Sequence, residues 1–388
     1  MKYNFDEIIP RHNTGSLKYD DCMSIYGASD LLPMWIADMD FKTPDCIVDA
    51  LKKRLEHPIF GYFNHSKEFY ESIISWMQKR HQWQVEKDWI TFAPTVVTAL
   101  ATLIQAFTKS GDKILVQPPV YYPFFTVVKN QNRTIVENPL KLEGDLYKMD
   151  FFDLENKLKT GVAMMILCNP HNPVGRCWQP EELQKVAELC LKYNTLLISD
   201  EIHSDLIMRG YRHTVVASLS SAIAENTITC MSPSKTFNLA GMTTSEVLIS
   251  NEKLRSRYQD LMNNHHFLCV GNIFGELALQ TAYFQGEEWL EQLLDYLTSN
   301  VQFTKELLAA KCPEITTYQH EATYVLWVNF KNFGMCHEHL REKLIKNAKL
   351  ALNDGTIFGT GGECHFRMNL ACPKSTIQEA VNRLSDVF

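Results

Sequence analysis

The sequence contains no long uninterrupted apolar run. Its longest apolar stretch, Val96–Phe107, is broken by Thr98, Thr102 and Gln105, and it is shorter than the ~20 residues that span a bilayer. The first 13 residues mix acidic and basic side chains with apolar ones, so they lack the apolar core of a signal peptide. We therefore expect a cytoplasmic protein with no membrane partner.

The cysteines follow neither of the two common structural patterns. There are 11 of them, an odd number, with no C-x-x-C pair and no Cys/His cluster at zinc spacing. Disulfide frameworks usually use paired cysteines in short secreted chains, and structural zinc sites need closely spaced ligands. We expect reduced, buried thiols, with neither disulfides nor a bound metal.

Positive charge is also scarce. The chain has 38 Lys and Arg against 45 Asp and Glu, a formal net charge of -7. Proteins that bind nucleic acids concentrate positive charge against the phosphate backbone, so we expect no nucleic-acid partner and instead a small-molecule ligand. With 45% hydrophobic and 21% charged residues, the composition is that of a globular protein. A length of 388 residues favours two or three domains.

Helical patterns alternate with short apolar runs through the first three quarters of the chain. Helices are predicted over residues 43–57, 66–83, 96–109 and 180–193, and buried strands over 113–117, 162–168, 195–199 and 227–231. Prolines, asparagines or acidic residues end most of these strands. Short, continuously apolar strands separated by helices predict an α/β fold with a mostly parallel central sheet covered by helices on both faces.

The pattern changes after about Gly286. A long helix is predicted over residues 287–311, followed by alternating segments at 323–330 and 365–370, which are typical of a smaller α+β domain. We therefore expect three parts. These are an N-terminal segment (1–45) that packs with the small domain, a large ligand-binding domain (46–285) and a small C-terminal domain (286–388).

Polar side chains follow four of the predicted strands. They are Tyr121, Tyr122, Asn172, Asp200, Ser232, Ser234 and Lys235. Ligands of open parallel sheets bind outside the carboxyl ends of the strands. Taken singly, each residue has an ordinary structural role, because an aspartate caps helices, a tyrosine packs in loops and a lysine is usually a surface charge. Taken together, they bring an amine, a carboxylate, hydroxyls and aromatic rings to one cleft.

This combination suits pyridoxal 5′-phosphate (PLP). Lysine amines form Schiff bases with aldehydes, and a carboxylate keeps the pyridine nitrogen protonated, so that the ring accepts electrons from a carbanion. An aromatic side chain stacks on the ring, while hydroxyls and helix-start amides bind the phosphate. The pattern alone leaves this reading and the ordinary structural one equally open.

Five separated motifs resemble those of the fold-type I PLP enzymes of aminotransferase class I/II. The motifs lie at residues 35–41 (Trp-Ile-Ala-Asp-Met-Asp-Phe), 120–124 (Val-Tyr-Tyr-Pro-Phe), 168–175 (Cys-Asn-Pro-His-Asn-Pro-Val-Gly), 199–203 (Ser-Asp-Glu-Ile-His) and 232–238 (Ser-Pro-Ser-Lys-Thr-Phe-Asn). The resemblance continues to residues 366–373 and so spans nearly the whole chain. It is greatest to the branch of cystathionine β-lyases and cysteine C–S lyases that includes cystalysin.

The resemblance implies a role for each matching residue. Lys235 matches the Schiff-base lysine and Asp200 the partner of the pyridine nitrogen. Asn172 matches the residue that hydrogen-bonds the ring hydroxyl, and Tyr121 lies where the stacking aromatic is found. Arg367 matches the arginine that binds the substrate α-carboxylate, a task that suits its planar two-point geometry.

The phosphate site is implied in the same way. Ser232 matches a hydroxyl donor that Ser234 assists, and Val96 and Val97 match residues whose backbone N–H groups meet the phosphate at a helix start. Tyr62 resembles a tyrosine that reaches the phosphate of the neighbouring subunit. The resemblance therefore implies a homodimer with composite active sites.

Four positions depart from the family pattern. Thr95 stands where glycine is common, and Ala322 replaces a glycine that often follows glutamate. His203 takes the place of a tyrosine found in many transaminases, and we expect it either to contact the cofactor or to pack as a neutral side chain. Thr243 stands where transaminases commonly have an arginine.

The function implied is C–S bond cleavage in cystathionine, cysteine or another S-substituted cysteine by α,β-elimination. Lys235 would remove the α-proton, and Tyr121 or the substrate-facing Tyr122 would protonate the departing thiolate, leaving pyruvate and ammonia. The nearest alternative is an aminotransferase with the same site. A ligand-sensing protein that retains the pocket is a second alternative. A third, a barrel with aldolase-type Schiff-base chemistry, is disfavoured by the separate C-terminal domain that carries Arg367.

Overall fold

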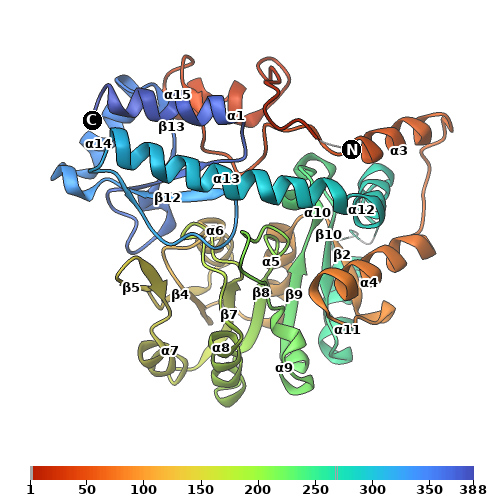
Figure 1. The fold of residues 1–388 in the computed structure, drawn as a ribbon. Coiled ribbons are helices and arrows are strands. Elements are labelled where there is room, and N and C mark those ends of the chain that lie inside the picture. The colour runs from red at the N-terminus through yellow and green to blue at the C-terminus, as the bar shows by residue number, and fades with distance from the viewer. Residues whose placement is uncertain (1–2, 267, 269) are drawn as a thin grey trace.

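The computed structural model describes residues 3–266, 268 and 270–388. Its centre is a seven-stranded sheet with the strand order β2-β10-β9-β8-β7-β3-β4 (Figure 1). The strands are β2 (Ile90–Ala93), β3 (Lys113–Val116), β4 (Thr134–Glu137), β7 (Val162–Cys168), β8 (Leu196–Asp200), β9 (Thr227–Met231) and β10 (Ser245–Leu248). Strand β10 runs antiparallel to both neighbours, and all other pairs are parallel. The predicted mostly parallel sheet is therefore confirmed.

Helices cover both faces of this sheet. One face carries α5 (Val96–Phe107), α6 (Pro123–Lys129) and α11 (Glu252–Asp260), and the other carries α7 (Phe151–Leu158), α8 (Pro180–Lys192) and α9 (Ser221–Glu225). Strand β7 explains the arrangement, because Met164 and Ile166 pack in the core with α5, whereas Met165 and Leu167 pack in the core with α8. Successive side chains of a strand point to opposite faces, so a continuously apolar strand has to be covered twice.

Most predicted elements appear within a few residues of their expected bounds, but three strands of the central sheet were missed. Strands β2, β4 and β10 have only four residues each. The end of β2 lies three residues before α5 begins, β4 is a half-exposed edge strand, and β10 contains the charged residue Glu246. Polar residues within each segment leave no continuous apolar run of the kind that Ile114–Val116 forms in the equally short β3.

The second sheet is small and antiparallel, and it has the strand order β11-β12-β15-β14. Its strands are β11 (Thr316–Thr317), β12 (Val325–Asn329), β14 (Asn353–Asp354) and β15 (His365–Asn369). Figure 1 shows the long helix α13 (Glu287–Lys311) lying across the top of the large sheet and reaching the small one, beside α14 (His337–Lys346) and α15 (Lys374–Ser385). One continuous core of buried side chains joins α4 (Lys67–His81), α12 (Ile273–Gln285), α13 and the small sheet.

The N-terminal segment is attached to the C-terminal part of the chain. Strand β1 (Leu32–Pro33) pairs in parallel with β13 (Leu350–Ala351), and the Asp40 N–H donates to the carbonyl of Ala371. The next helix, α3 (Asp45–Leu55), instead packs on α12. We therefore propose the division at residues 1–45, 46–285 and 286–388. Over the described residues, no helix is long and apolar enough to cross a membrane.

Candidate active site

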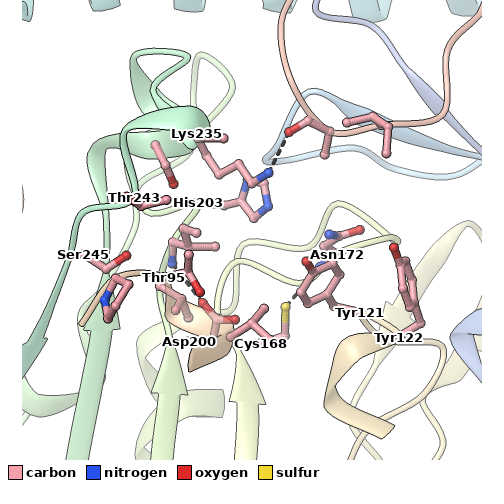
Figure 2. Close-up of a pocket in the computed structure, with 18 of the residues that line it drawn as sticks. Thr95, Tyr121, Tyr122, Cys168, Asn172, Asp200, His203, Lys235, Thr243 and Ser245 are labelled. Carbon is pink, nitrogen blue, oxygen red and sulfur yellow. Dashed lines mark hydrogen bonds between the residues drawn. The ribbon is translucent and has the colours of Figure 1, made fainter. Parts of the chain in front are cut away.

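A cavity of about 330 Å³ lies at the carboxyl ends of the parallel strands. Figure 2 shows Cys168 and Asp200, the last residues of β7 and β8, at its floor. Ten of the twelve residues predicted for the site line it. These are Val96, Val97, Tyr121, Tyr122, Asn172, Asp200, His203, Ser234, Lys235 and Arg367. Residues from both sheets and from the N-terminal segment therefore meet in one cavity.

Lys235 lies in the short helix α10 (Pro233–Thr236), and its side chain reaches into the cavity. Its Nζ donates a hydrogen bond to the carbonyl of Ala37 at 2.7 Å, drawn as a dashed line in Figure 2. Burial, together with the nearby charge of Arg367, lowers the pKa of Lys235 to about 8. A lysine with such a pKa supplies a neutral, nucleophilic amine near neutral pH.

Asp200 is a buried carboxylate for which the described residues supply no ion pair within 4 Å. Its Oδ1 accepts one hydrogen bond, from the Ile202 N–H at 3.2 Å. Burial raises the pKa of Asp200 to about 7, since a charge in low dielectric is disfavoured. A buried carboxylate with so few donors fits a ligand that brings a cationic N–H, as a protonated pyridine nitrogen does.

The start of α5 forms one end of the cavity. Thr95 is the N-cap residue, and its hydroxyl accepts the Thr98 N–H at 3.1 Å. Val96 and Val97 follow as the first helical residues and line the cavity. Because the first N–H groups of a helix have no intrahelical partner, this 12-residue helix offers donors and a positive dipole end to an anion.

Hydroxyl groups complete this end of the cavity. Figure 2 shows Thr95, Thr243 and Ser245 on one side, opposite Tyr121 and Asn172. The hydroxyl of the neighbouring Thr244, which also lines the cavity, is buried without a partner. An unpaired buried hydroxyl is costly unless a ligand satisfies it. These donors fit a phosphate group, and no sequence motif marks Thr243, Thr244 or Ser245 as phosphate ligands.

Ser232 does not line the cavity. Its hydroxyl accepts the Ser234 N–H at 3.1 Å and donates to the carbonyl of Thr244 at 2.8 Å. The side chain thus caps α10 and ties it to the segment before β10. Within the protein its hydroxyl thus both donates and accepts a hydrogen bond, and a phosphate contact for Ser232 stays a prediction.

The two substitutions of expected glycines cause no backbone strain. Thr95 has φ −145°, which is extended backbone that any residue adopts. Ala322 does not have a positive φ; Thr323, the next residue, does. The Ala322 N–H donates to the carbonyl of Gly175 at 3.0 Å. The left-handed residue of this turn is therefore Thr323 and not Ala322.

The tyrosine side of the cavity carries an aromatic face and a protonated hydroxyl. The rings of Tyr121 and Tyr122 lie 5.5 Å apart. Burial, with the nearby Tyr122 and Asp200, raises the pKa of Tyr121 far above its usual range, so its hydroxyl remains a proton donor at neutral pH.

His203 is buried with no partner for Nδ1, and burial holds its pKa well below the usual value, so it stays neutral.

Arg367 is held in place by neutral oxygens. Its Nη1 donates to Asn172 Oδ1 at 3.0 Å, and its Nη2 donates to the Trp35 carbonyl at 3.0 Å and to Asn353 Oδ1 at 2.6 Å. Its Nε is buried without a partner. No carboxylate of the described residues forms an ion pair with this guanidinium, so its charge remains available for the carboxylate of a ligand. Asn353 was not found from the sequence, because no motif marks it.

Tyr62 lies outside the cavity. Its side chain is fully exposed, at 110% of the reference area, in the segment between α3 and α4. Figure 1 shows this segment running along the edge of the molecule. Within one chain, the structure therefore does not bring Tyr62 to the other predicted site residues.

Comparison with known proteins identifies the family. The family model for aminotransferase class I and II matches residues 29–384. The chain belongs to this family. It is similar to the cystathionine beta-lyase PatB of Bacillus subtilis (strain 168), with 41% identity over 382 residues that cover 98% of both chains.

Solved structures agree with this assignment. Cystalysin from Treponema denticola, which contains a PLP cofactor, superimposes with a TM-score of 0.96 and 38% identity, covering 100% of this chain and 99% of its own. The PLP-bound C–S lyase from Staphylococcus hominis superimposes with a TM-score of 0.93 and 32% identity, covering 100% and 98%. The predicted family, the fold-type I architecture and the PLP cofactor are confirmed.

Proposed function

We propose that this chain is a PLP-dependent C–S β-lyase that cleaves cystathionine, cysteine or another S-substituted cysteine to pyruvate, ammonia and a thiol or sulfide. The observation that carries the proposal is the meeting of Lys235, Asp200 and Arg367 in one cavity. This cavity lies in a chain that is 41% identical to a cystathionine β-lyase along nearly its whole length. The aminotransferase alternative has weaker support from the relatives.

In the proposed site, one end of the cavity binds the cofactor and the other end binds the substrate. Asp200 would hold the pyridine nitrogen, and the α5 start with its nearby hydroxyls would hold the phosphate. When bound, PLP supplies an aldehyde that reacts with amines and a ring that accepts electrons from a carbanion. At the other end, Arg367 binds the α-carboxylate of the substrate through its guanidinium, which Asn172 and Asn353 keep in orientation.

Two side chains move protons in this proposal. The amine of Lys235 removes the proton from the substrate α-carbon, a step that its lowered pKa favours at neutral pH. The bond between the β-carbon and sulfur then breaks, and the thiolate departs with the electron pair. Tyr121, which stays protonated in the cavity, or the adjacent Tyr122 supplies the proton that neutralises the thiolate. Water completes the release of pyruvate and ammonia.

A product assay tests the function directly. Incubation of the PLP-loaded protein with cystathionine, cysteine or an S-alkyl cysteine should release pyruvate and free thiol or sulfide in equal amounts, without an added 2-oxo acid. An aminotransferase would instead need the 2-oxo acid, convert it to an amino acid and leave the C–S bond intact. Conversion of an added 2-oxo acid to its amino acid, with no release of pyruvate or thiol, would refute the lyase.

Arg367→Lys should raise KM for S-substituted cysteines by about 10- to 100-fold while cofactor affinity changes little. A lysine keeps the charge but loses the planar two-point contact with a carboxylate. Steady-state kinetics and a PLP titration of both proteins measure the two effects. If Arg367 serves only to bind Asn353 of the neighbouring strand β14, KM would be unchanged while the unfolding temperature falls.

We also propose that the chain forms a homodimer with composite active sites. Four large side chains within the eight residues from Leu55 to Tyr62 are exposed: Leu55 at 55%, Ile59 at 64%, Phe60 at 53% and Tyr62 at 110%. Such a dense apolar group is unusual on the surface of a monomer and is typical of an interface. The partner covering it would bring Tyr62 toward the phosphate end of the neighbouring site.

A cytoplasmic location is proposed as well, supported by the ten described cysteines, all of which are free thiols.

Mixing Tyr62→Ala protein with Lys235→Ala protein should restore activity if the sites are composite. Each variant is impaired alone, but a heterodimer contains one site with both residues intact. Random exchange at equal concentrations makes half of the dimers mixed, so about a quarter of the wild-type site number should recover. Activity assays and sedimentation follow the exchange. A monomer, or proven exchange without recovery, would contradict the composite site.

A further inference from the structure

Residues 35–41, which we name the strap, connect the two cations of the site. The Ala37 carbonyl accepts the hydrogen bond from Lys235 Nζ at 2.7 Å, and the Trp35 carbonyl accepts one from Arg367 Nη2 at 3.0 Å. Ile36 and Ala37 also line the cavity. The amine proposed to move the proton and the guanidinium proposed to bind the substrate therefore rest on carbonyls two residues apart in the same strap.

Two asparagines fasten the strap beside these cations. Asn238, three residues after Lys235, donates to the carbonyls of Met39 and Phe41 at 3.0 and 3.1 Å and accepts the Met39 N–H at 3.0 Å. Asn369, two residues after Arg367, donates to the carbonyls of Ile36 and Asp38, both at 2.6 Å. Displacement of the strap would thus disturb the hydrogen bonds of Lys235 and Arg367 together.

The strap also carries a compact cluster of charges. Lys18, only 1% exposed, binds Asp40 Oδ2 at 2.7 Å and lies 3.8 Å from Asp38 Oδ1. Arg11 binds Asp38 Oδ2 at 2.6 Å and Asp40 Oδ1 at 2.7 Å. The indole N–H of Trp35 donates to the Lys18 carbonyl at 2.9 Å. Lys18 therefore holds the strap through its side chain and through its backbone.

We propose that Lys18 is a positioning residue for the reaction. By binding Asp40, it fixes the strap and with it the spacing of Lys235 and Arg367, although it touches neither. A buried ion pair is geometrically demanding, because each charge is satisfied only while the partner keeps its place. The adjacent Leu17 lines the cavity, so the same contact also fixes one wall of the substrate space.

The test uses the PLP-loaded full chain with Lys18→Met, Asp40→Asn and the double substitution. Lys18→Met should raise KM for an S-substituted cysteine about tenfold with a smaller change in kcat, because the substrate clamp is misplaced while the chemical groups remain. The Kd for L-alanine, which has the carboxylate but no leaving group, should rise in parallel. Hydrogen exchange at the Met39 and Asp40 amides should quicken. Because Asp40 also binds Arg11, Asp40→Asn removes the Lys18 pair together with a second one, so the double variant should be no worse than Asp40→Asn alone.

Lys42→Met is the matched control. Lys42 lies one residue beyond the strap and pairs with Glu7 at 2.7 Å, but this pair is exposed, at 61% and 42%. Removing it should leave KM, the L-alanine Kd and strap exchange unchanged. The kinetic measurement rests on the proposed lyase function, whereas L-alanine binding and hydrogen exchange need no turnover, so failure of the function and failure of this inference are distinguishable.

Two results would overturn the inference. One is a folded Lys18→Met protein that has a lower unfolding temperature but wild-type KM, L-alanine affinity and strap exchange, as a purely structural role requires. The other is additive KM effects of Lys18→Met and Asp40→Asn in the double variant. If Lys18→Met does not fold, the double variant decides, because it leaves neither member of the pair charged and should still show the raised Kd and faster strap exchange.

Discussion

Lys235→Ala should abolish turnover, with a loss of about 10⁴-fold or more in kcat/KM. The substitution removes both the amine that attaches the cofactor and the base that takes the α-proton, and no other lysine of the described residues lines the cavity. Borohydride reduction of the loaded wild-type protein makes the cofactor attachment permanent. Peptide mapping should then find the added mass on the peptide that contains Lys235, and kinetics should show the loss of activity.

Lys305→Ala provides the control for this experiment. Lys305 is another partly buried lysine whose pKa is lowered by burial, and its Nζ donates to the Tyr318 carbonyl at 2.8 Å, outside the cavity. Its loss should leave kcat/KM nearly unchanged and the yellow colour of the loaded protein intact. Added mass on any lysine other than Lys235, or substantial turnover by Lys235→Ala, would contradict the assignment.

Asp200→Asn should affect the loaded and the cofactor-free protein in opposite directions. In the loaded protein, a neutral amide cannot hold a protonated pyridine nitrogen, and the loss of one charge-assisted hydrogen bond of ~1.5–3 kcal/mol should weaken PLP retention by about 10- to 100-fold. Elimination should slow as well, because the ring accepts electrons less readily. PLP titration and steady-state kinetics measure these effects.

The cofactor-free variant should be more stable than the cofactor-free wild type, in a manner that depends on pH. Burial raises the pKa of Asp200 from 3.8 to about 7 in the folded protein, so the folded state binds a proton that the unfolded chain has released. The stability contributed by this group is thus complete below about pH 4 and is lost as the pH rises through about 7. Asparagine has no charge to bury, so the variant should gain most above pH 7 and little near pH 4.

Thermal unfolding of both cofactor-free proteins between pH 4 and 8 measures this difference. Equal unfolding temperatures at pH 8 would show that the carboxylate of Asp200 is solvated and not buried. Wild-type PLP affinity and turnover in Asp200→Asn would instead reduce Asp200 to a turn residue. The two measurements are independent, because only the second requires the cofactor.

The elements predicted best from the sequence are those whose signals are local. Strand β7 was predicted with its exact bounds, because an apolar run is closed by a proline-containing segment, and α13 was predicted because its apolar periodicity is long. Strand β10 was missed because its buried Glu246 resembles a surface residue in sequence. Its carboxylate is tolerated in the core because Tyr283, from α12, donates a hydrogen bond to it, and a partner 37 residues away leaves no local signal.

The sequence by itself determined the type of chemistry. Apolar runs ending in polar residues placed Asn172, Asp200 and Lys235 at the carboxyl ends of parallel strands, and the motifs supplied their roles. That inference succeeded because strand ends and helix starts are set by neighbouring residues, which periodicity and turn-forming residues reveal.

Only the tertiary structure decided how these groups are held. Arg367 reaches the cavity by binding Asn172, 195 residues away in sequence, and the strap meets Lys235 across 198 residues. Ser232 caps α10 and does not line the cavity, whereas Thr243 and Ser245 do line it. Such outcomes depend on which distant elements pack together and on which donors remain unpaired once they do. No local pattern encodes either, because both are set by burial and hydrogen bonding between segments far apart in the chain.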